Sequence, residues 1–470
     1  MATEAVSVPV PAGVPVPAPT SAIPVPAGIP LLGSLFDLTR RPLRSYLAAR
    51  RDHGDVVHFQ AGPPGLRADF YGVFSPEGVH QVLAGEAANF RKEDAFYDEL
   101  RTNVGNGLLT SQDAEYQRQR RLVQPLFTRR RVDGYADAIA REAQSLADRW
   151  RAVPGGVVDA AEETSRFALR TVARVLFGTD VEEAVAVVHR SFPVLGEYVK
   201  ERGYAPIRLP RTWPTPSNRR GAEARRALYE VCDRIIAERA TRDGVDEAAD
   251  DLLTLLGRAR DEHGDRLDPD ELRDQVLVFL LAGHETTATA LAFALHLLAK
   301  HPEQRRLARE EARTVLAGRA PTAADLDALP YITRVLKEAM RLYPAAALGG
   351  RRAVAETVIG GYVIPAGAQV VVAPLVTHRH PDHWVDPERF DPDRFLPEAE
   401  KTRHRYAWFP FGGGPRACIG QHFSMLEAVL ALGVLLRDFE IEAVDQRVAL
   451  AQGITLRAAS PMRIRVTAGG

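Results

Sequence analysis

Apolar residues recur at helical intervals through the middle of the chain. Between Asp113 and Arg341 they return every three or four positions, with breaks in the proline-rich stretch 206–216 and at Pro321 and Pro330. Such a period is typical of helices that turn one face to a core. This part of the chain is therefore predicted to be almost entirely helical.

Short segments on either side of the helical region alternate between apolar and polar positions. A period of two predicts half-buried strands. The predicted strands are 55–60, 68–74, 357–359, 362–364 and 369–373, a short helix spans 76–83, and a final hairpin pairs 454–456 with 462–466. Because the strands are few and short, the predicted fold class is mainly α, a large multi-helical fold with a minor antiparallel β portion.

Proline recurs at short intervals through the first thirty residues, as in Val8–Pro11 and Val14–Pro17. The segment has neither the basic start of a signal peptide nor the unbroken apolar run of a membrane helix. We expect residues 1–30 to form a flexible, extended tail and residues 31–470 to form a single domain.

The overall composition is that of an ordinary globular protein. Of 470 residues, 46% are hydrophobic and 26% are charged, and the formal net charge is −1, which does not support bulk nucleic-acid binding. The arginine-rich stretch 118–131 is local, so it favours a docking surface for an acidic partner protein over a nucleic-acid site. Of the two cysteines, Cys232 follows a helical pattern and is expected to be buried, and a reducing, cytoplasmic setting fits best.

The longest apolar helix is predicted to begin at Asp268 and to end before Pro302. Asp268 is a good N-cap, Pro269 suits the first helical position, and Glu271 completes a capping-box pattern. Because the helix is apolar on most faces, it must be buried.

The interior of this helix contains the sequence Ala282-Gly283-His284-Glu285-Thr286-Thr287. Glycine, a carboxylate and β-branched hydroxyls are poor choices for a buried helix. Thr286 could bond back to the carbonyl of Ala282 as a purely structural feature, or the helix could open locally to form part of a site. Val278, Ala282 and Thr286 are spaced i, i+4 and i+8, so they share one face.

One cysteine lies in a glycine-rich loop, Phe411-Gly-Gly-Gly-Pro-Arg-Ala-Cys418-Ile-Gly420, ahead of an apolar helical run. The glycines let the backbone approach a flat ligand. A position at the start of a helix favours an anionic sulfur, because free N–H groups point toward it. A buried structural cysteine is the alternative, but the composition of the loop favours a metal-bound thiolate at Cys418, with Arg416 facing an acidic edge of the ligand.

The loop resembles the heme-binding signature of the cytochrome P450 superfamily, F-x-x-G-x-R-x-C-x-G, at every fixed position, Phe411 included. The resemblance implies heme b, with Cys418 as its proximal thiolate. The segment at 282–287 is similar to the family's A-G-x-(D/E)-T-(T/S) element. That similarity places Ala282 and Gly283 against the heme, gives Thr286 the task of holding dioxygen and a water, and makes Glu285 the source of protons.

Further family motifs suggest cations for the heme propionates and a lock for the fold. The propionate candidates are Arg416, Arg351 and Arg120. Tyr116 stands where the family usually has Trp or His four residues before this last arginine, and the resemblance assigns it as a heme contact. Glu338 and Arg341 form an E-x-x-R pair, a surface salt bridge in most proteins, which in the family joins an arginine of a P-E-R-F segment. Here that segment is 387–390, so Arg389 is assigned to the lock.

The resemblance implies a monooxygenase that inserts one oxygen atom of O₂ into a nonpolar small molecule, with electrons from a separate ferredoxin or flavodoxin and an NAD(P)H-dependent reductase. We expect a monomer that binds neither nucleic acid nor membrane. The substrate is predicted to be a terpenoid, with a fatty acid second. A peroxide-driven enzyme and a non-catalytic heme sensor or carrier are the alternatives. A separate metal site at His378, His380 and His383 is a further alternative. The pocket is predicted to be lined by Val278, Ala282, Ala346, Leu348 and Ile454.

Overall fold

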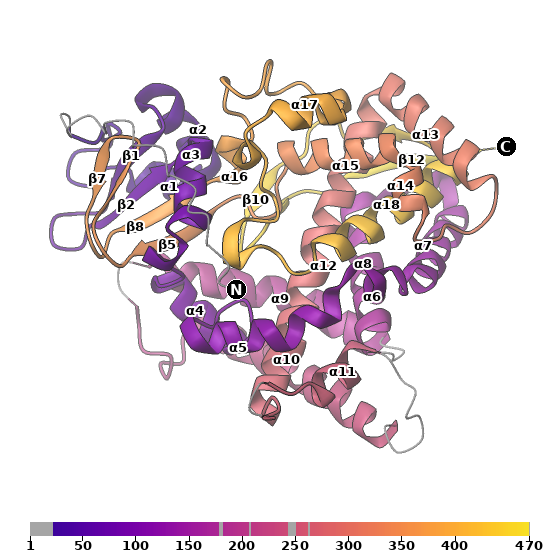
Figure 1. Cartoon of the computed structure of the whole chain (residues 1–470), viewed down its shortest axis with the longest axis horizontal. Helices are drawn as coiled ribbons and strands as arrows, with labels where there is room; N and C mark the ends of the chain where they lie inside the picture. Colours follow the sequence, from indigo (N-terminus) through magenta and orange to yellow (C-terminus); the bar gives the residue numbers. More distant parts are fainter. Residues whose placement is uncertain (1–21, 178–181, 206–207, 243–250, 262–263, 470) are drawn as a thin grey trace, which may run out of the picture.

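Helices make up most of this computed structural model, which describes residues 22–177, 182–205, 208–242, 251–261 and 264–469. The largest sheet lies at one end of the molecule, at the left in Figure 1, and the long helices fill the rest. The helices are α1 (Leu35–Arg40), α2 (Pro42–His53), α3 (Pro76–His80), α4 (Ala95–Val104), α5 (Asp113–Val123), α6 (Arg129–Asp133), α7 (Ala136–Arg151), α8 (Ala160–Phe177), α9 (Glu182–Gly203), α10 (Pro216–Arg242), α11 (Leu252–Arg258), α12 (Pro269–Lys300), α13 (Pro302–Leu316), α14 (Asp325–Ala328), α15 (Pro330–Leu342), α16 (Pro374–Thr377), α17 (Pro397–Thr402) and α18 (Gln421–Asp438).

The strands form a five-stranded sheet in the order β1-β2-β8-β5-β3, a three-stranded sheet in the order β4-β12-β9, and two hairpins, β6-β7 and β10-β11. All pairs are antiparallel except β2 with β8, which run parallel. The strands are β1 (Val56–Ala61), β2 (Ala68–Val73), β3 (Phe90–Arg91), β4 (Val157–Asp159), β5 (Gly349–Ala353), β6 (Thr357–Ile359), β7 (Tyr362–Ile364), β8 (Gln369–Val372), β9 (Phe439–Ala443), β10 (Leu450–Gln452), β11 (Leu456–Ala458) and β12 (Arg463–Ala468).

The predicted final hairpin is wrong. Strand β11 pairs with β10, while β12 pairs with β4 on one side and with β9 on the other. The alternation at the end of the chain identified a strand correctly, but a period of two shows only that a strand has two faces. The alternation contains no information about which strand is the partner, and β4 lies some three hundred residues earlier in the chain.

The buried helix α12 starts as the sequence predicts. The Asp268 side chain accepts from the Glu271 N–H and the Glu271 side chain accepts from the Asp268 N–H, a complete capping box. Within the described part of the chain, α12 is the one helix long and apolar enough to cross a membrane, but 78% of that apolar window is buried inside the protein. It therefore forms the centre of the core, packed along α8 and against α18.

Most of the predicted tail lies outside the described residues, but its last part contacts the domain. The Pro24 carbonyl accepts a hydrogen bond from the His58 N–H of β1, and Ile29 pairs with Gly33. Contact with the folded body therefore begins before residue 30.

Candidate functional site

The loop before α18 has a backbone that only glycine adopts without strain. Gly412 and Gly414 have φ angles of 68° and 61°, in the left-handed region. A Cβ on Gly414 would lie 2.0 Å from the carbonyl oxygen of Leu83. The loop is closed by the Cys418 N–H, which donates to the Phe411 carbonyl at 2.9 Å. The helix starts at Gln421, so Cys418 precedes its first turn instead of lying within it.

Cys418 is closely surrounded by protein atoms and yet retains accessible surface. Burial raises the pKa of this thiol, while the N–H of Gly420 and the positive charges of Arg120 and Lys92 act to lower it. An accessible cysteine with cations beside it fits a ligand that stabilises its anionic form.

Three cations crowd together beside this loop. Arg416, Arg351 and Lys92 repel one another, and burial together with this repulsion lowers the pKa of Lys92 well below its ordinary value. Burial is also the main reason that the pKa of Arg416 falls to about 10. The Arg416 side chain donates through one amino group to Gln112 at 2.7 Å, but its other amino nitrogen, Nη1, is buried without a partner.

Uncompensated cations of this kind are costly unless an anion joins them. The unpartnered nitrogen of Arg416 therefore fits the carboxylates of a heme, as predicted for Arg416 and Arg351. The lysine of the cluster was not predicted, because nothing in the sequence around Lys92 distinguishes it from a surface residue.

Tyr116 and Arg120 brace the cysteine loop. The Tyr116 hydroxyl donates to the Pro415 carbonyl at 2.8 Å, and Arg120 donates to the Ala417 carbonyl at 2.8 Å. The guanidinium of Arg416 stacks 3.6 Å from the centre of the Tyr116 ring. Because the one O–H of Tyr116 is already donated to the backbone, this structure does not place it as a donor to heme, and its role is to support the loop.

Helix α12 passes the start of α18 at the predicted oxygen-handling segment. The Thr287 hydroxyl donates to the Ser424 hydroxyl at 3.0 Å, which ties the segment to the helix that follows Cys418. The neighbouring Thr286 hydroxyl donates to the Ala282 carbonyl at 2.8 Å. The helix is uninterrupted from Pro269 to Lys300, so the expected local opening does not break it.

Gly283 does not face the predicted heme side. A Cβ at this position would lie 3.0 Å from Val172, so Gly283 allows α12 to pack closely against α8. Ala282, in contrast, is exposed in the middle of a helix that is otherwise mostly buried. Ala282 and Thr286 therefore keep their assignment to one open face, and Gly283 loses its assignment as a heme contact.

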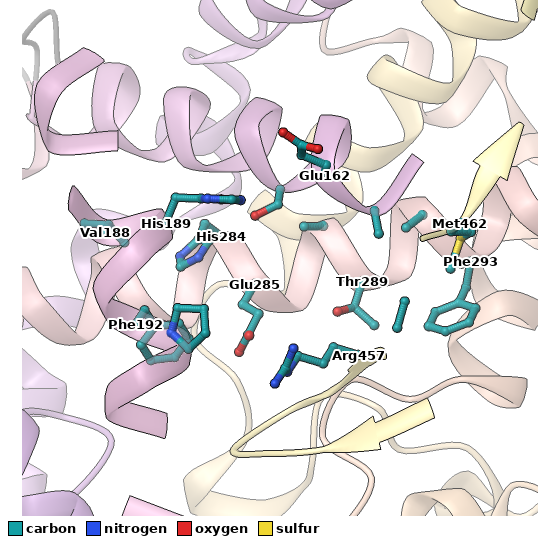
Figure 2. A pocket seen from close by; sticks show the side chains of 16 residues that line it. Glu162, Val188, His189, Phe192, His284, Glu285, Thr289, Phe293, Arg457 and Met462 are labelled. Carbon is teal, nitrogen blue, oxygen red and sulfur yellow. The ribbon is translucent and has the colours of Figure 1, made fainter. Parts of the chain in front are cut away.

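Glu285 points to a different space from Thr286. It lines a cavity of about 260 Å³ between α8, α9, α12 and β11 (Figure 2), which includes neither Cys418 nor Arg416. Its carboxyl accepts a hydrogen bond from the Thr455 hydroxyl at 2.5 Å. Burial raises the pKa of Glu285, and the bond from Thr455 and the charge of Arg457 oppose that rise.

The remaining predicted pocket residues come from three separate segments. Val278 is buried on α12, Ala346 is exposed, and Leu348 is partly buried beside the large sheet. Ile454 packs near Gly196 of α9, where a Cβ would lie 3.6 Å from its side chain. The Leu456 N–H donates to the Ala345 carbonyl at 2.8 Å, which joins the Ile454 segment to the one that contains Ala346.

The E-x-x-R pair is fully buried, not a surface salt bridge. Glu338 and Arg341 are both 0% exposed and make two contacts, at 2.6 and 2.8 Å. Arg389 contributes only its backbone carbonyl, because its side chain is 63% exposed and bonds to Asp391. The arginine side chain beside Glu338 is that of Arg394, at 3.4 Å. The assignment of Arg389 to the lock is therefore corrected to Arg394, which belongs to a second P-x-R-F segment, 392–395.

The other candidates are structural. Cys232 is buried in α10, as predicted. His378 is buried and accepts from the Phe409 N–H, and burial lowers its pKa well below its ordinary value. The part of the chain that the structure describes holds no cluster of three or more His, Cys, Asp or Glu side chains that could bind a metal ion, so the separate histidine metal site is excluded there.

Comparison with known proteins agrees with this geometry. The family model described as cytochrome P450 matches residues 23–460. Pentalenene oxygenase of Streptomyces avermitilis is 37% identical over 444 residues, which cover 93% of this chain and 96% of that protein. Cyclooctat-9-en-7-ol 5-monooxygenase of Streptomyces melanosporofaciens is 37% identical over 416 residues, 88% of each chain. The solved heme domain of cytochrome P450DA superposes with a TM-score of 0.85 at 30% identity, covering 95% of this chain and 98% of that one.

Proposed function

The chain belongs to the cytochrome P450 family and is a heme b monooxygenase, and on this basis we propose that its substrate is a nonpolar terpenoid. The observation that carries the proposal is the similarity to terpenoid oxygenases of Streptomyces along nearly the whole chain. The predicted pocket residues support it, because Val278, Ala346, Leu348 and Ile454 are all apolar. The transfer of an uncharged hydrocarbon skeleton from water to such an apolar surface lowers the free energy.

Residues of the site divide the work of the reaction. Cys418 would hold the heme, whose iron would supply the redox chemistry for oxygen insertion. Arg416, Arg351 and Lys92 would hold the heme carboxylates, which would offset the repulsion among the three cations. The hydroxyl of Thr286 would hold a water on the open face of α12, and Glu285 would supply protons for the reaction.

Members of the family receive electrons from a redox partner. For this chain we propose a separate ferredoxin or flavodoxin with an NAD(P)H-dependent reductase, acting on a cytoplasmic monomer. The arginine-rich stretch 118–131 remains the proposed docking surface. Some of its charge is already compensated, since Arg118 pairs with Glu271 and Arg129 with Asp327, which leaves Arg130 as an exposed contributor.

The substrate class is tested by titration of the ferric enzyme, with the Soret band as the signal. A cyclic terpene hydrocarbon and a terpenoid alcohol should displace water from the iron and shift the band at micromolar concentration. Dodecanoic acid should not, because the predicted lining has no cation for its carboxylate. Tighter binding of the fatty acid than of both terpenoids would favour the second substrate class.

We expect Thr286→Ala to bind substrate normally but to lower the product formed per NAD(P)H by about tenfold or more, with the lost electrons recovered as hydrogen peroxide. Loss of the hydroxyl removes the group that holds the proton-donating water. Thr286→Ser should restore most of the coupling.

The same measurement separates the alternative functions. Undiminished coupling in Thr286→Ala, together with full turnover by hydrogen peroxide alone, would identify a peroxide-driven enzyme. No product from any substrate, with or without the redox partner, would identify a sensor or carrier.

A further inference from the structure

The carboxyl of Glu285 is hydrogen-bonded by one side chain of the segment 453–457. Thr455 is 8% exposed, and its hydroxyl donates to Oε2 of Glu285 at 2.5 Å. This is a contact between residues 170 positions apart in the chain. None of the sequence motifs includes Thr455.

Backbone contacts fix this segment on both sides of Thr455. The Leu456 N–H donates to the Ala345 carbonyl at 2.8 Å, and the Thr289 hydroxyl of α12 donates to the Leu456 carbonyl at 3.2 Å. The Gly453 N–H donates to the carbonyl of Thr455 itself at 2.9 Å. The hydroxyl therefore has a set position relative to α12 and does not simply follow the glutamate.

Glu285 accepts this bond while it lines the cavity of about 260 Å³ between α8, α9, α12 and β11, which is called the side cavity below. In Figure 2 the Glu285 carboxyl and the Arg457 guanidinium point toward the same space below α12. The other titratable groups that line this cavity are Glu162 of α8, His189 of α9 and His284 of α12. Burial keeps His284 neutral, with its pKa lowered to about 4. Arg457 is thus the cation that this side of the cavity presents to Glu285.

We propose that Thr455 is a positioning residue that holds the Glu285 carboxyl in the side cavity, where it takes up a proton, before the carboxyl delivers that proton next to Thr286. The inference rests on the proposed function of Glu285. It places a residue that affects proton transfer between β10 and β11, outside the oxygen-handling segment. Because Ile454 is the adjacent residue, the predicted substrate pocket and the proton donor are held by one short piece of backbone.

The hydrogen bond from Thr455 shifts the pKa of Glu285 in a definite direction. A hydroxyl that donates to a carboxylate stabilises the charged form and so lowers the carboxyl pKa, whereas burial raises it. When the hydroxyl is removed, only the charge of Arg457 still opposes the rise in pKa that burial causes. The pKa of Glu285 should then rise, and a smaller fraction of Glu285 should be ionised at any given pH.

The test is an infrared pH titration of the ferric, substrate-free holoenzyme, in which the Glu285 carboxyl band is identified by its absence in Glu285→Gln. In Thr455→Val, which keeps the shape but lacks the donor, the Glu285 pKa should rise by on the order of one pH unit. Thr455→Ser should restore the wild-type value. The matched control is Thr289→Val, which removes another hydroxyl bond between α12 and this segment. It should change the Glu285 pKa much less than Thr455→Val does, because the backbone bonds of Leu456 and Gly453 remain.

Either an unchanged Glu285 pKa in Thr455→Val or an equal rise in Thr289→Val would overturn the inference. The titration needs no turnover, so it is independent of the proposed reaction. In turnover, the pH dependence of product formed per NAD(P)H should move in the same direction and by the same amount in Thr455→Val. If Glu285→Gln leaves that ratio unchanged while the titration behaves as expected, the proton role of Glu285 fails and the contact with Thr455 stands.

Discussion

The Cys418→Ser variant is expected to lose the red-shifted Soret band of the reduced carbon-monoxide complex and to lose turnover entirely. That band requires a thiolate bound to the iron, and serine supplies a hydroxyl that does not ionise at neutral pH. The thiolate also pushes electron density onto the iron and favours O–O cleavage, which a neutral oxygen ligand does not do. The variant retains the cations at Arg416, Arg351 and Lys92, so it should still bind heme. The spectra are therefore compared at matched heme content.

The other cysteine provides the matched control for this prediction. Cys232 is 0% exposed within α10, and burial raises its pKa far above the ordinary value, so it remains a neutral thiol. Cys232→Ala should lower the stability through lost packing and leave the carbon-monoxide spectrum unchanged. A normal spectrum from Cys418→Ser, or a lost band in Cys232→Ala, would contradict the assignment of the thiolate.

Features set by neighbouring residues could be predicted from the sequence. The start of α12 follows from Asp268, Pro269 and Glu271, which satisfy the free N–H groups of the first turn without help from the rest of the protein. The cysteine loop follows in the same way, because positive φ angles at Gly412 and Gly414 need glycine whatever surrounds them.

Features set by tertiary contact could not be predicted. Strand β12 was found, but its partners β4 and β9 were not, because alternation describes faces and not neighbours. Gly283 was placed on the heme side by its motif, although its direction depends on how closely α8 approaches α12. Lys92 and Thr455 belong to no motif, and their importance arises only when Arg416 and Glu285 are brought beside them.

The exchange of Arg389 for Arg394 shows the limit of motif matching. Two P-x-R-F segments follow each other within nine residues, and 387–390 is the closer match by letters. Burial decides between them, since the side chain of Arg394 is 9% exposed and that of Arg389 is 63% exposed. Burial of a charge beside Glu338 is a property of the folded chain.

The buried ion pair leads to the largest expected effect on stability. Arg341→Ala should lower the free energy of unfolding by about 3–5 kcal/mol, because it leaves the Glu338 carboxylate buried beside a cavity with its main partner gone. The same change removes the donors to three backbone carbonyls, those of His378, Pro387 and Arg389. These carbonyls come from the segment that leads to the cysteine loop, so heme retention should fall together with stability.

Denaturant unfolding of the holoenzyme measures the effect, with Arg389→Ala as the matched control. This control removes an exposed side chain that pairs with Asp391, so it should leave the free energy of unfolding nearly unchanged. Arg394→Ala should lie between the two, because a side chain 3.4 Å from Glu338 is lost while Arg341 still binds both carboxylate oxygens. A loss in Arg389→Ala as large as that in Arg341→Ala would mean that the exposed arginine, and not Arg394, completes the lock.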